Sequence, residues 1–237
     1  RRFDTYGNDL TYSYTGDELT RVTTATGEFV QYRWLDGRVD RIEVRFYASE
    51  ADKDAQILTE TTRTYYKYDD HGRLHKVFTD LTPDDNNVSD LDRFETIYEY
   101  VGSTNRIARI TQSDGAKAEF DYDASGRIEE VRQFVSDTDI RVTQYAYHTG
   151  YTEITDPRGA VTQIHFDAQS RLTQIVSPEP SPGAGSQTTQ IEYHDTPSVD
   201  DDWARKVIIT RPDGTQIENQ YDENGNLFRM IDPEGIV

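Results

Sequence analysis

Apolar and polar residues alternate along most of the chain. The segment 66–68 reads Tyr-Lys-Tyr, and the segment 120–122 reads Phe-Asp-Tyr. Successive side chains of a strand point to opposite faces, so a period of two places both rings on one face. The pattern predicts many short β-strands that each show one face to water, whereas helix signals are almost absent.

A recurring turn segment interrupts this alternation. The clearest copies are 66–74 (YKYDDHGRL), 120–128 (FDYDASGRI) and 219–227 (NQYDENGNL). Each contains an aromatic residue, Asp, two polar residues, Gly, Arg or Asn, and an aliphatic residue. The spacing indicates a unit of about 20 residues with insertions, as in repeat proteins whose loops vary. With the degenerate copies included, the aromatic before the turn falls at Tyr14, Trp34, Tyr68, Tyr100, Tyr122, Tyr147, Phe166, Tyr193 and Tyr221.

The recurring segment has the composition of a hairpin turn. Asp can accept hydrogen bonds from backbone N–H groups two residues on, which makes an Asx-turn. The Gly that follows tolerates the positive φ that the loop needs, so we predict positive φ at Gly72, Gly126 and Gly225. The aliphatic positions Leu74 and Val77 are offset by one residue, which indicates a twist or a bulge. The residues to which we assign structural roles in the turns are Tyr68, Asp69, Gly72, Arg73, Tyr122, Asp123, Gly126, Arg127, Tyr221, Asp222 and Gly225.

A second kind of turn joins one repeat to the next. Pro and Gly stand at β-turn positions in 155–159, 211–214 and 231–235. Alternation of strand, Tyr–Asp turn, strand and Pro/Gly turn predicts a continuous antiparallel ribbon. The expected fold is therefore all-β, an array of consecutive antiparallel hairpins forming a curved ribbon, with no helix longer than about two turns.

The repeats predict one array over 1–237, cut within the array at both ends. Loop insertions are expected near 48–57, 81–92 and 177–187, because repeats resume on both sides of each. Residues 47–58 could form a short turn of helix, but an extended hairpin loop is the favoured prediction.

Composition narrows the class of partner. The 237 residues are 34% hydrophobic and 11% aromatic, which argues against a disordered acidic polymer. With 44 acidic against 25 basic residues the net charge is −19, so a nucleic-acid partner is not expected. Cysteine is absent, which excludes disulfides and thiol nucleophiles within the chain. No apolar run is long enough to predict a membrane-spanning helix.

The motif Tyr-Asp-x-x-Gly-Arg-Leu, spaced by Asp-Pro-x-Gly turns, strongly resembles the YD-repeat (Rhs-repeat) family over essentially the whole chain. That family includes bacterial polymorphic toxins, wall-associated proteins, shell subunits of insecticidal toxin complexes and animal teneurins. In it the ribbon coils into a large hollow shell, which in toxin members encloses a C-terminal toxin domain. No residue here matches the family's autoproteolytic aspartates, so self-cleavage and toxicity are not carried over.

The resemblance implies a structural segment of such a shell in an exported bacterial protein, secreted or on the cell surface. The implied partners are the rest of the shell and an encapsulated C-terminal cargo domain. The alternative is a surface-exposed adhesion module that binds glycans or a protein. No group of residues supports a catalytic function such as polysaccharide processing. We therefore expect no catalytic activity and no cofactor.

Candidate chemistry is sparse. His71 and His75 have a metal-like spacing, but the turn lies around His71, so the spacing lacks its helical meaning. The acidic runs 84–85 and 200–202 could hold calcium, although solvated loop charge is the favoured interpretation. The tyrosine stripe could stack on sugars or on a cargo protein, but packing against neighbouring strands is favoured. Trp34 and Trp203 are the candidate ligand-stacking residues.

Overall fold

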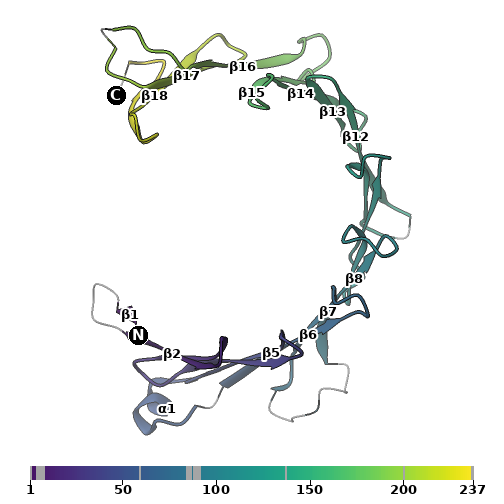
Figure 1. Ribbon diagram of the computed structural model, residues 1–237. Helices are drawn as coiled ribbons and strands as arrows, with labels where there is room; N and C mark the ends of the chain where they lie inside the picture. Colours follow the sequence, from purple (N-terminus) through teal and green to yellow (C-terminus); the bar gives the residue numbers. More distant parts are fainter. Residues whose placement is uncertain are drawn as a thin grey trace. The chain divides into compact units, whose positions relative to one another are not determined.

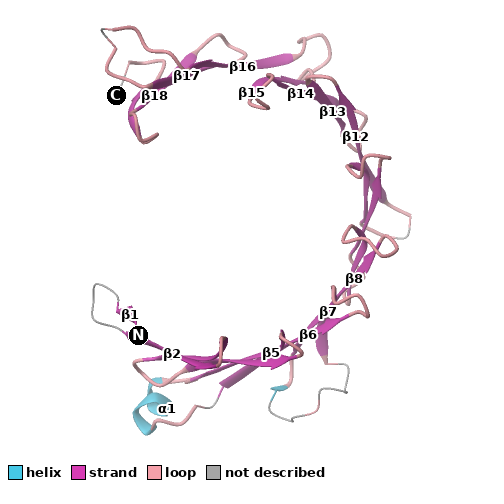
Figure 2. Ribbon diagram, viewed as in Figure 1, coloured by secondary structure: helices cyan, strands magenta, loops and turns pink. Residues whose placement is uncertain are grey.

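The computed structural model describes residues 2–3, 9–58, 60–83, 87, 92–136, 138–199 and 201–235 (Figure 1). The chain divides into two compact units, one of residues 1–120 and 133–140 and the other of residues 121–132 and 141–237. The division runs through three strands, β10 (Lys117–Tyr122), β11 (Ile128–Phe134) and β12 (Ile140–His148). Each unit consists of antiparallel strands joined by turns (Figure 2).

The first unit pairs each strand with its neighbour in sequence. A short α-helix, α1 (Glu50–Ala55), lies between two of these strands. The other elements are β1 (Arg2–Phe3), β2 (Asp9–Thr15), β3 (Glu18–Thr24), β4 (Phe29–Leu35), β5 (Arg38–Phe46), β6 (Glu60–Tyr68), β7 (Leu74–Asp80), β8 (Arg93–Tyr100) and β9 (Ile107–Gln112).

The second unit follows the same rule, with antiparallel pairing between consecutive strands. The expected all-β succession of antiparallel hairpins is therefore confirmed, and the expected limit on helix length holds for the part of the chain that the structure describes. Its remaining strands are β13 (Tyr151–Thr155), β14 (Val161–Phe166), β15 (Leu172–Ser177), β16 (Gln187–His194), β17 (Arg205–Thr210), β18 (Gln216–Tyr221) and β19 (Leu227–Ile231).

The register shifts by one residue just before the aromatic of the turn. Tyr68 lies opposite Leu74 while Lys67 lies opposite Lys76, so His75 is the extra residue of a β-bulge. The offset of the aliphatic positions predicted from the sequence is therefore a bulge. The same shift occurs before Tyr14, Trp34, Tyr100, Phe166 and Tyr221.

The two faces of the sheet differ in chemistry. In the second unit, Tyr145 pairs with Ile154, and Ile164 pairs with Ile175, along an aromatic and aliphatic face. The opposite face is mostly polar, although Tyr65 and Phe78 also lie on it. In the first unit its pairs run Glu43 to Arg63, Arg63 to Asp80 and Asp80 to Arg93 across four strands. Side chains on both faces are mostly half-buried, as expected of a sheet one layer thick.

Tight packing is confined to small clusters. In the first unit, the rings of Tyr65 and Phe78 stack with centroids 4.7 Å apart. Beside them Arg63 and Asp80 form a buried ion pair of 3.0 Å, and Arg63 also donates to the backbone carbonyl of Pro83. In the second unit, the buried aromatic residue is Trp203. Backbone ladders and cross-strand pairs therefore carry more of the fold than a central core does.

The segment 47–58 contains the helix α1. The favoured prediction of an extended hairpin loop there is therefore wrong. Ser49 caps the helix by accepting the backbone N–H of Asp52 at 3.2 Å. Acidic residues in the first turn and Lys53 in the last complement the helix dipole, and Gln56 ends the helix at φ 54°. The other expected insertions, near 81–92 and 177–187, also lie between consecutive strands. Much of 81–92 is outside the described residues.

The turns have the predicted backbone. Gly72, Gly126 and Gly225 have φ of 74°, 82° and 82°. In the first of these turns, Asp69 N donates to the Arg73 carbonyl at 2.9 Å, and Gly72 N donates to the Asp69 carbonyl at 2.8 Å. This is a three-residue hairpin loop, a type I turn closed by a residue in the left-handed conformation.

One turn keeps this backbone without glycine. Ser170 has φ 62°, at the position that glycine holds in the other clear copies. The left-handed conformation costs a non-glycine residue about 1 kcal/mol, partly offset by the greater unfolded-state freedom of glycine. We expect Ser170→Gly to raise the free energy of unfolding in urea by about 0.5–1 kcal/mol. Ser125→Gly, a matched change in an ordinary turn position, should not raise it, and equal gains at both sites would contradict the assignment.

Candidate functional site: the Tyr–Asp turn edge

Each clear Tyr–Asp turn is organised by its Asp side chain. Asp69 Oδ1 accepts the backbone N–H groups of His71 and Arg73, both at 2.9 Å, and Oδ2 accepts Nε of Arg73 at 2.7 Å. Asp123 holds Arg127 and Asp167 holds Arg171 in the same way. Asp222 instead binds the side chain of Asn226, at 3.1 Å. The Asp therefore fixes the turn backbone and the direction of the following side chain together.

These bonds stabilise the ionised carboxylate. The side-chain hydrogen bond from Arg73, together with the backbone N–H groups, lowers the pKa of Asp69 to about 2. Backbone and side-chain hydrogen bonds from Arg127 lower the pKa of Asp123, and those from Arg171 lower that of Asp167. A carboxylate held ionised in this way is an acceptor at neutral pH and is unsuited to act as a general acid.

The arginine also reaches the next hairpin. The guanidinium carbon of Arg73 lies 4.3 Å from the ring centroid of Tyr100, and Nη1 donates to the Gly102 carbonyl at 2.9 Å and to the Thr104 carbonyl. Arg127 and Arg171 make the same cation–π contact, at 4.1 Å with Tyr147 and 4.4 Å with Tyr193 respectively.

The tyrosine of the next hairpin donates a hydrogen bond to the hairpin that carries the arginine. Tyr100 donates its hydroxyl to the Leu74 carbonyl at 2.7 Å, Tyr147 to Ile128 at 2.8 Å, and Tyr193 to Leu172 at 3.0 Å. In each case the acceptor is the residue after the arginine. We call this set the staple: an Asp-held Arg, the Tyr ring of the next hairpin beneath it, and the Tyr hydroxyl on the adjoining carbonyl.

The first unit contains variants of the staple. Tyr68 donates to the Val39 carbonyl at 3.0 Å, and Arg38 lies over its ring at 5.5 Å. Arg38 also lies against Gly72, where a Cβ would collide with its guanidinium. Trp34 takes the place of the tyrosine, since its indole N–H donates to the Leu19 carbonyl at 2.8 Å. Trp34 is therefore a repeat aromatic with a structural contact.

Trp203, the other candidate ligand-stacking residue of the sequence analysis, is buried. It is 8% exposed, and Lys206 Nζ lies 5.0 Å from its ring. The loop that carries it is fastened by the Ala204 N–H, which donates to the Tyr221 carbonyl at 2.8 Å, and by Asp202, which pairs with Arg229 at 3.0 Å. Its burial arises from a loop that folds back on the sheet, which the local sequence does not reveal.

Of the other predicted turn residues, Tyr122 ends β10, and Tyr221 lies under Arg205, 4.8 Å from its guanidinium carbon. Sequence reasoning placed Tyr100, Tyr147 and Tyr193 among the repeat aromatics but predicted no contact between them and the arginine of the preceding turn. The signal that could have found this contact is an Arg in one turn followed by a Tyr before the next turn.

Among the described residues, the histidines and the acidic runs do not come together in one site. His75 Nδ1 lies 3.1 Å from the Tyr98 carbonyl, whereas His71 belongs to the Asp69 turn. Residues 84, 85 and 200 lie outside the described residues. In the described part of the chain, no group of three or more His, Cys, Asp or Glu side chains has the geometry to hold a metal ion.

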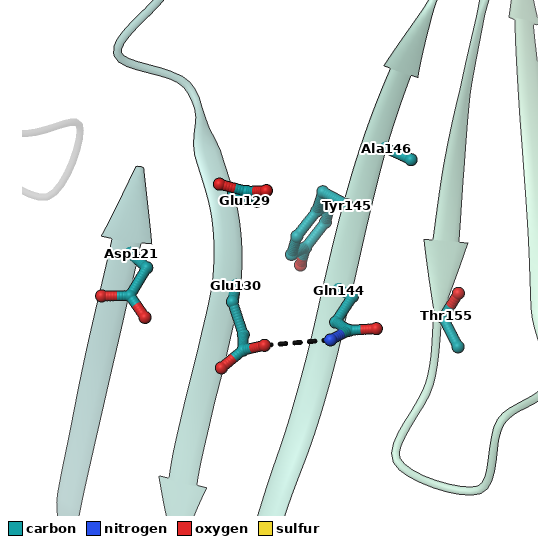
Figure 3. Close-up of a pocket in the computed structure, with 7 residues that line it drawn as sticks. All are labelled: Asp121, Glu129, Glu130, Gln144, Tyr145, Ala146 and Thr155. Atoms are coloured by element: carbon teal, nitrogen blue, oxygen red, sulfur yellow. Dashed lines mark hydrogen bonds between the residues drawn. The ribbon is translucent and has the colours of Figure 1, made fainter. Parts of the chain in front are cut away.

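A shallow polar hollow lies on the second unit (Figure 3). Glu130 accepts a hydrogen bond from Gln144 at 3.0 Å, and Arg132 lies between Asp121 at 2.6 Å and Glu130 at 2.5 Å. The hydrogen bonds from Gln144 and Arg132 lower the pKa of Glu130. In the hollow, Asp121 and Glu130 are thus already paired with neighbouring side chains.

No helix among the described residues is long and apolar enough to cross a membrane.

No family model and no curated protein matches this chain. Solved structures of toxin complexes are similar to it. The crystal structure of TcdB2-TccC3-Cdc42 matches with TM-score 0.39 at 13% identity, over 93% of this chain and 15% of that chain. The Photorhabdus luminescens Tc holotoxin pore, with a mutation in TccC3, matches with TM-score 0.40 at 12% identity, over 93% of this chain and 14% of that one. This chain therefore spans about a seventh of those chains.

The lowered pKa of Asp69 predicts how the free energy of unfolding depends on pH. A depressed folded-state pKa contributes stability that is present above the unfolded pKa, about 3.9, and is lost as pH falls toward the folded value of about 2. Asp69→Asn should therefore show a shallower loss of unfolding free energy between pH 4 and pH 2 than the wild type.

The matched control is Asp70→Asn, which changes an exposed neighbour in the same turn. It should leave the slope as in the wild type. Equal slopes for both variants, measured by urea unfolding at several pH values, would refute the role of Asp69.

Proposed function

We propose that this chain is a wall segment of a YD-repeat shell that encloses a toxin or other cargo domain in an exported bacterial protein. The observation that carries the proposal is the staple, because at three places in the described chain it bonds one hairpin to the next through the same atoms in the same order. A sheet extended by such a unit grows sideways without needing a second layer.

The faces of the sheet also suit a wall. The polar face is self-paired, as in the chain of contacts from Glu99 through Arg109 to Glu119, each 3.1 Å long. The opposite face carries half-buried aromatic, aliphatic and threonine side chains. A thin layer with one polar and one apolar face can separate an enclosed polypeptide from solvent.

We infer that the chain itself is not an enzyme. The Asp side chains of the clear turns are committed to backbone N–H groups and to Arg or Asn. In the hollow of the second unit, Asp121 is paired with Arg132, and Glu130 with Arg132 and Gln144. Their roles are accounted for by structure, which supports a passive segment.

The activity test uses the purified chain. Glycosidase, polysaccharide-lyase, nuclease and protease assays, with and without divalent metals, should show no turnover, and a glycan array should show no binding. Specific glycan binding would favour the adhesion module instead. Turnover that Glu130→Gln abolishes without unfolding the chain would overturn the structural proposal.

The enclosing role is tested by protease protection in the full-length protein that contains this chain. The cargo domain should resist brief proteolysis while the array is folded. Tyr147→Phe combined with Tyr193→Phe weakens two staples and should expose it. Cleavage of the cargo at the rate seen for the isolated cargo domain, with the array folded, would contradict enclosure.

A further inference from the structure

The staple is absent from the β13–β14 pair of the second unit, and we call a strand pair at which one Tyr–Asp hairpin meets the next a joint. In the β15–β16 pair, the register that places Gln174 opposite Gln190 brings Arg171 opposite Tyr193. In the β13–β14 pair, the register that places Tyr151 opposite His165 brings Gly150 opposite Phe166. Glycine thus stands where the arginine belongs, and phenylalanine where the tyrosine belongs.

All three parts of the staple are absent at this joint. His148 replaces the Asp that follows the aromatic, so the turn offers no carboxylate there. Gly150 has no side chain to stack, and Phe166 has no hydroxyl to donate. Phe166 is 38% exposed. Backbone pairing persists, since the Phe166 N–H donates to the Gly150 carbonyl at 2.8 Å.

Other contacts close the joint on the polar face. The rings of Tyr151 and His165 stack across the two strands with centroids 5.1 Å apart, and His148 stacks on the far side of Tyr151 at 4.4 Å. One step further from the turn, Gln163 donates to Glu153 at 2.9 Å. We call the Tyr151–His165 and Glu153–Gln163 contacts the latch.

The opposite end of the same strand pair is firmly closed. Asp156 Oδ1 accepts the backbone N–H groups of Arg158 at 2.8 Å and Ala160 at 2.9 Å. Asp156 N also donates to the Ala160 carbonyl at 2.9 Å. The pair is therefore anchored at the Asp-Pro-Arg-Gly turn. It is weakly held at the opposite edge of the sheet, where the Tyr–Asp turns lie, which we call the Tyr–Asp edge.

We propose that the β13–β14 pair is a built-in seam, at which the second unit opens from the Tyr–Asp edge while the hairpins on either side stay folded. The Asp156 turn acts as the hinge of this opening, and the latch holds it shut. A staple contributes one hydrogen bond and one cation–π contact that this joint lacks, so its edge opens roughly tenfold more often than a stapled one.

Amide hydrogen exchange on the chain, read residue by residue by NMR, tests the seam. Amides of 151–153 and 163–166 should exchange roughly tenfold faster than those of 172–174 and 190–193 at the stapled neighbour. Equal protection at the two joints would overturn the proposal.

Two reciprocal changes of a single hydroxyl sharpen the test. Phe166→Tyr supplies a donor opposite the Tyr151 carbonyl and should slow exchange at the β13–β14 edge roughly fivefold. Tyr193→Phe removes the bond to Leu172 and should speed exchange at the β15–β16 edge by a similar factor. Exchange at the β13–β14 edge that is unchanged by Phe166→Tyr, while Tyr193→Phe acts as expected, would exclude the missing staple as the cause.

The latch has its own control. His165→Ala removes the stack across the seam and should speed exchange at 151–153 more than at 190–193. His194→Ala, a histidine outside the seam, should leave 151–153 unchanged. Identical effects of the two variants at 151–153 would contradict the latch.

Discussion

The contact between the arginine of one hairpin and the tyrosine of the next is the interaction on which the array depends. A sheet one layer thick has little core, and among the described residues the buried apolar side chains are Tyr65, Phe78 and Trp203. Sideways cohesion must therefore come from backbone ladders and from contacts between neighbouring turns. Arg73 supplies such a contact, and its hydrogen bond to Asp69 fixes the guanidinium, which lowers the entropy lost on stacking.

This requirement explains the composition of the repeat. Asp is needed because one carboxylate must accept two backbone N–H groups and an arginine. Gly is favoured because the loop closes in the left-handed region, which Ser170 also adopts in one turn. The register of β7 on β8, in which Lys76 lies opposite Ile97, brings Arg73 beside Tyr100. The repeat is therefore a unit of geometry within this chain, and the joint at Gly150 and Phe166 keeps the register shift but lacks the Asp, Arg and Tyr side chains of the staple.

Features within one turn could be predicted from the sequence, and features between turns could not. The strands, the Asp69 turn and the φ of Gly72 follow from periodicity and local chemistry. The bond from Tyr100 to Leu74 spans 26 residues, and no local pattern reveals it. The α1 helix was the less favoured of two alternatives because its capping signals lie within a loop between two predicted strands. The burial of Trp203 depends on a loop that folds over the sheet, which a pattern of alternating residues does not describe.

The most direct test of the account is a double-mutant cycle between Arg73 and Tyr100. Arg73→Gln, Tyr100→Leu and the double variant would be unfolded in urea, and the coupling free energy taken from the four stabilities. Direct stacking of the guanidinium on the ring predicts a favourable coupling of about 1 kcal/mol. Additivity of the two single changes, within about 0.3 kcal/mol, would show that the hairpins are not joined through this pair and would contradict the account.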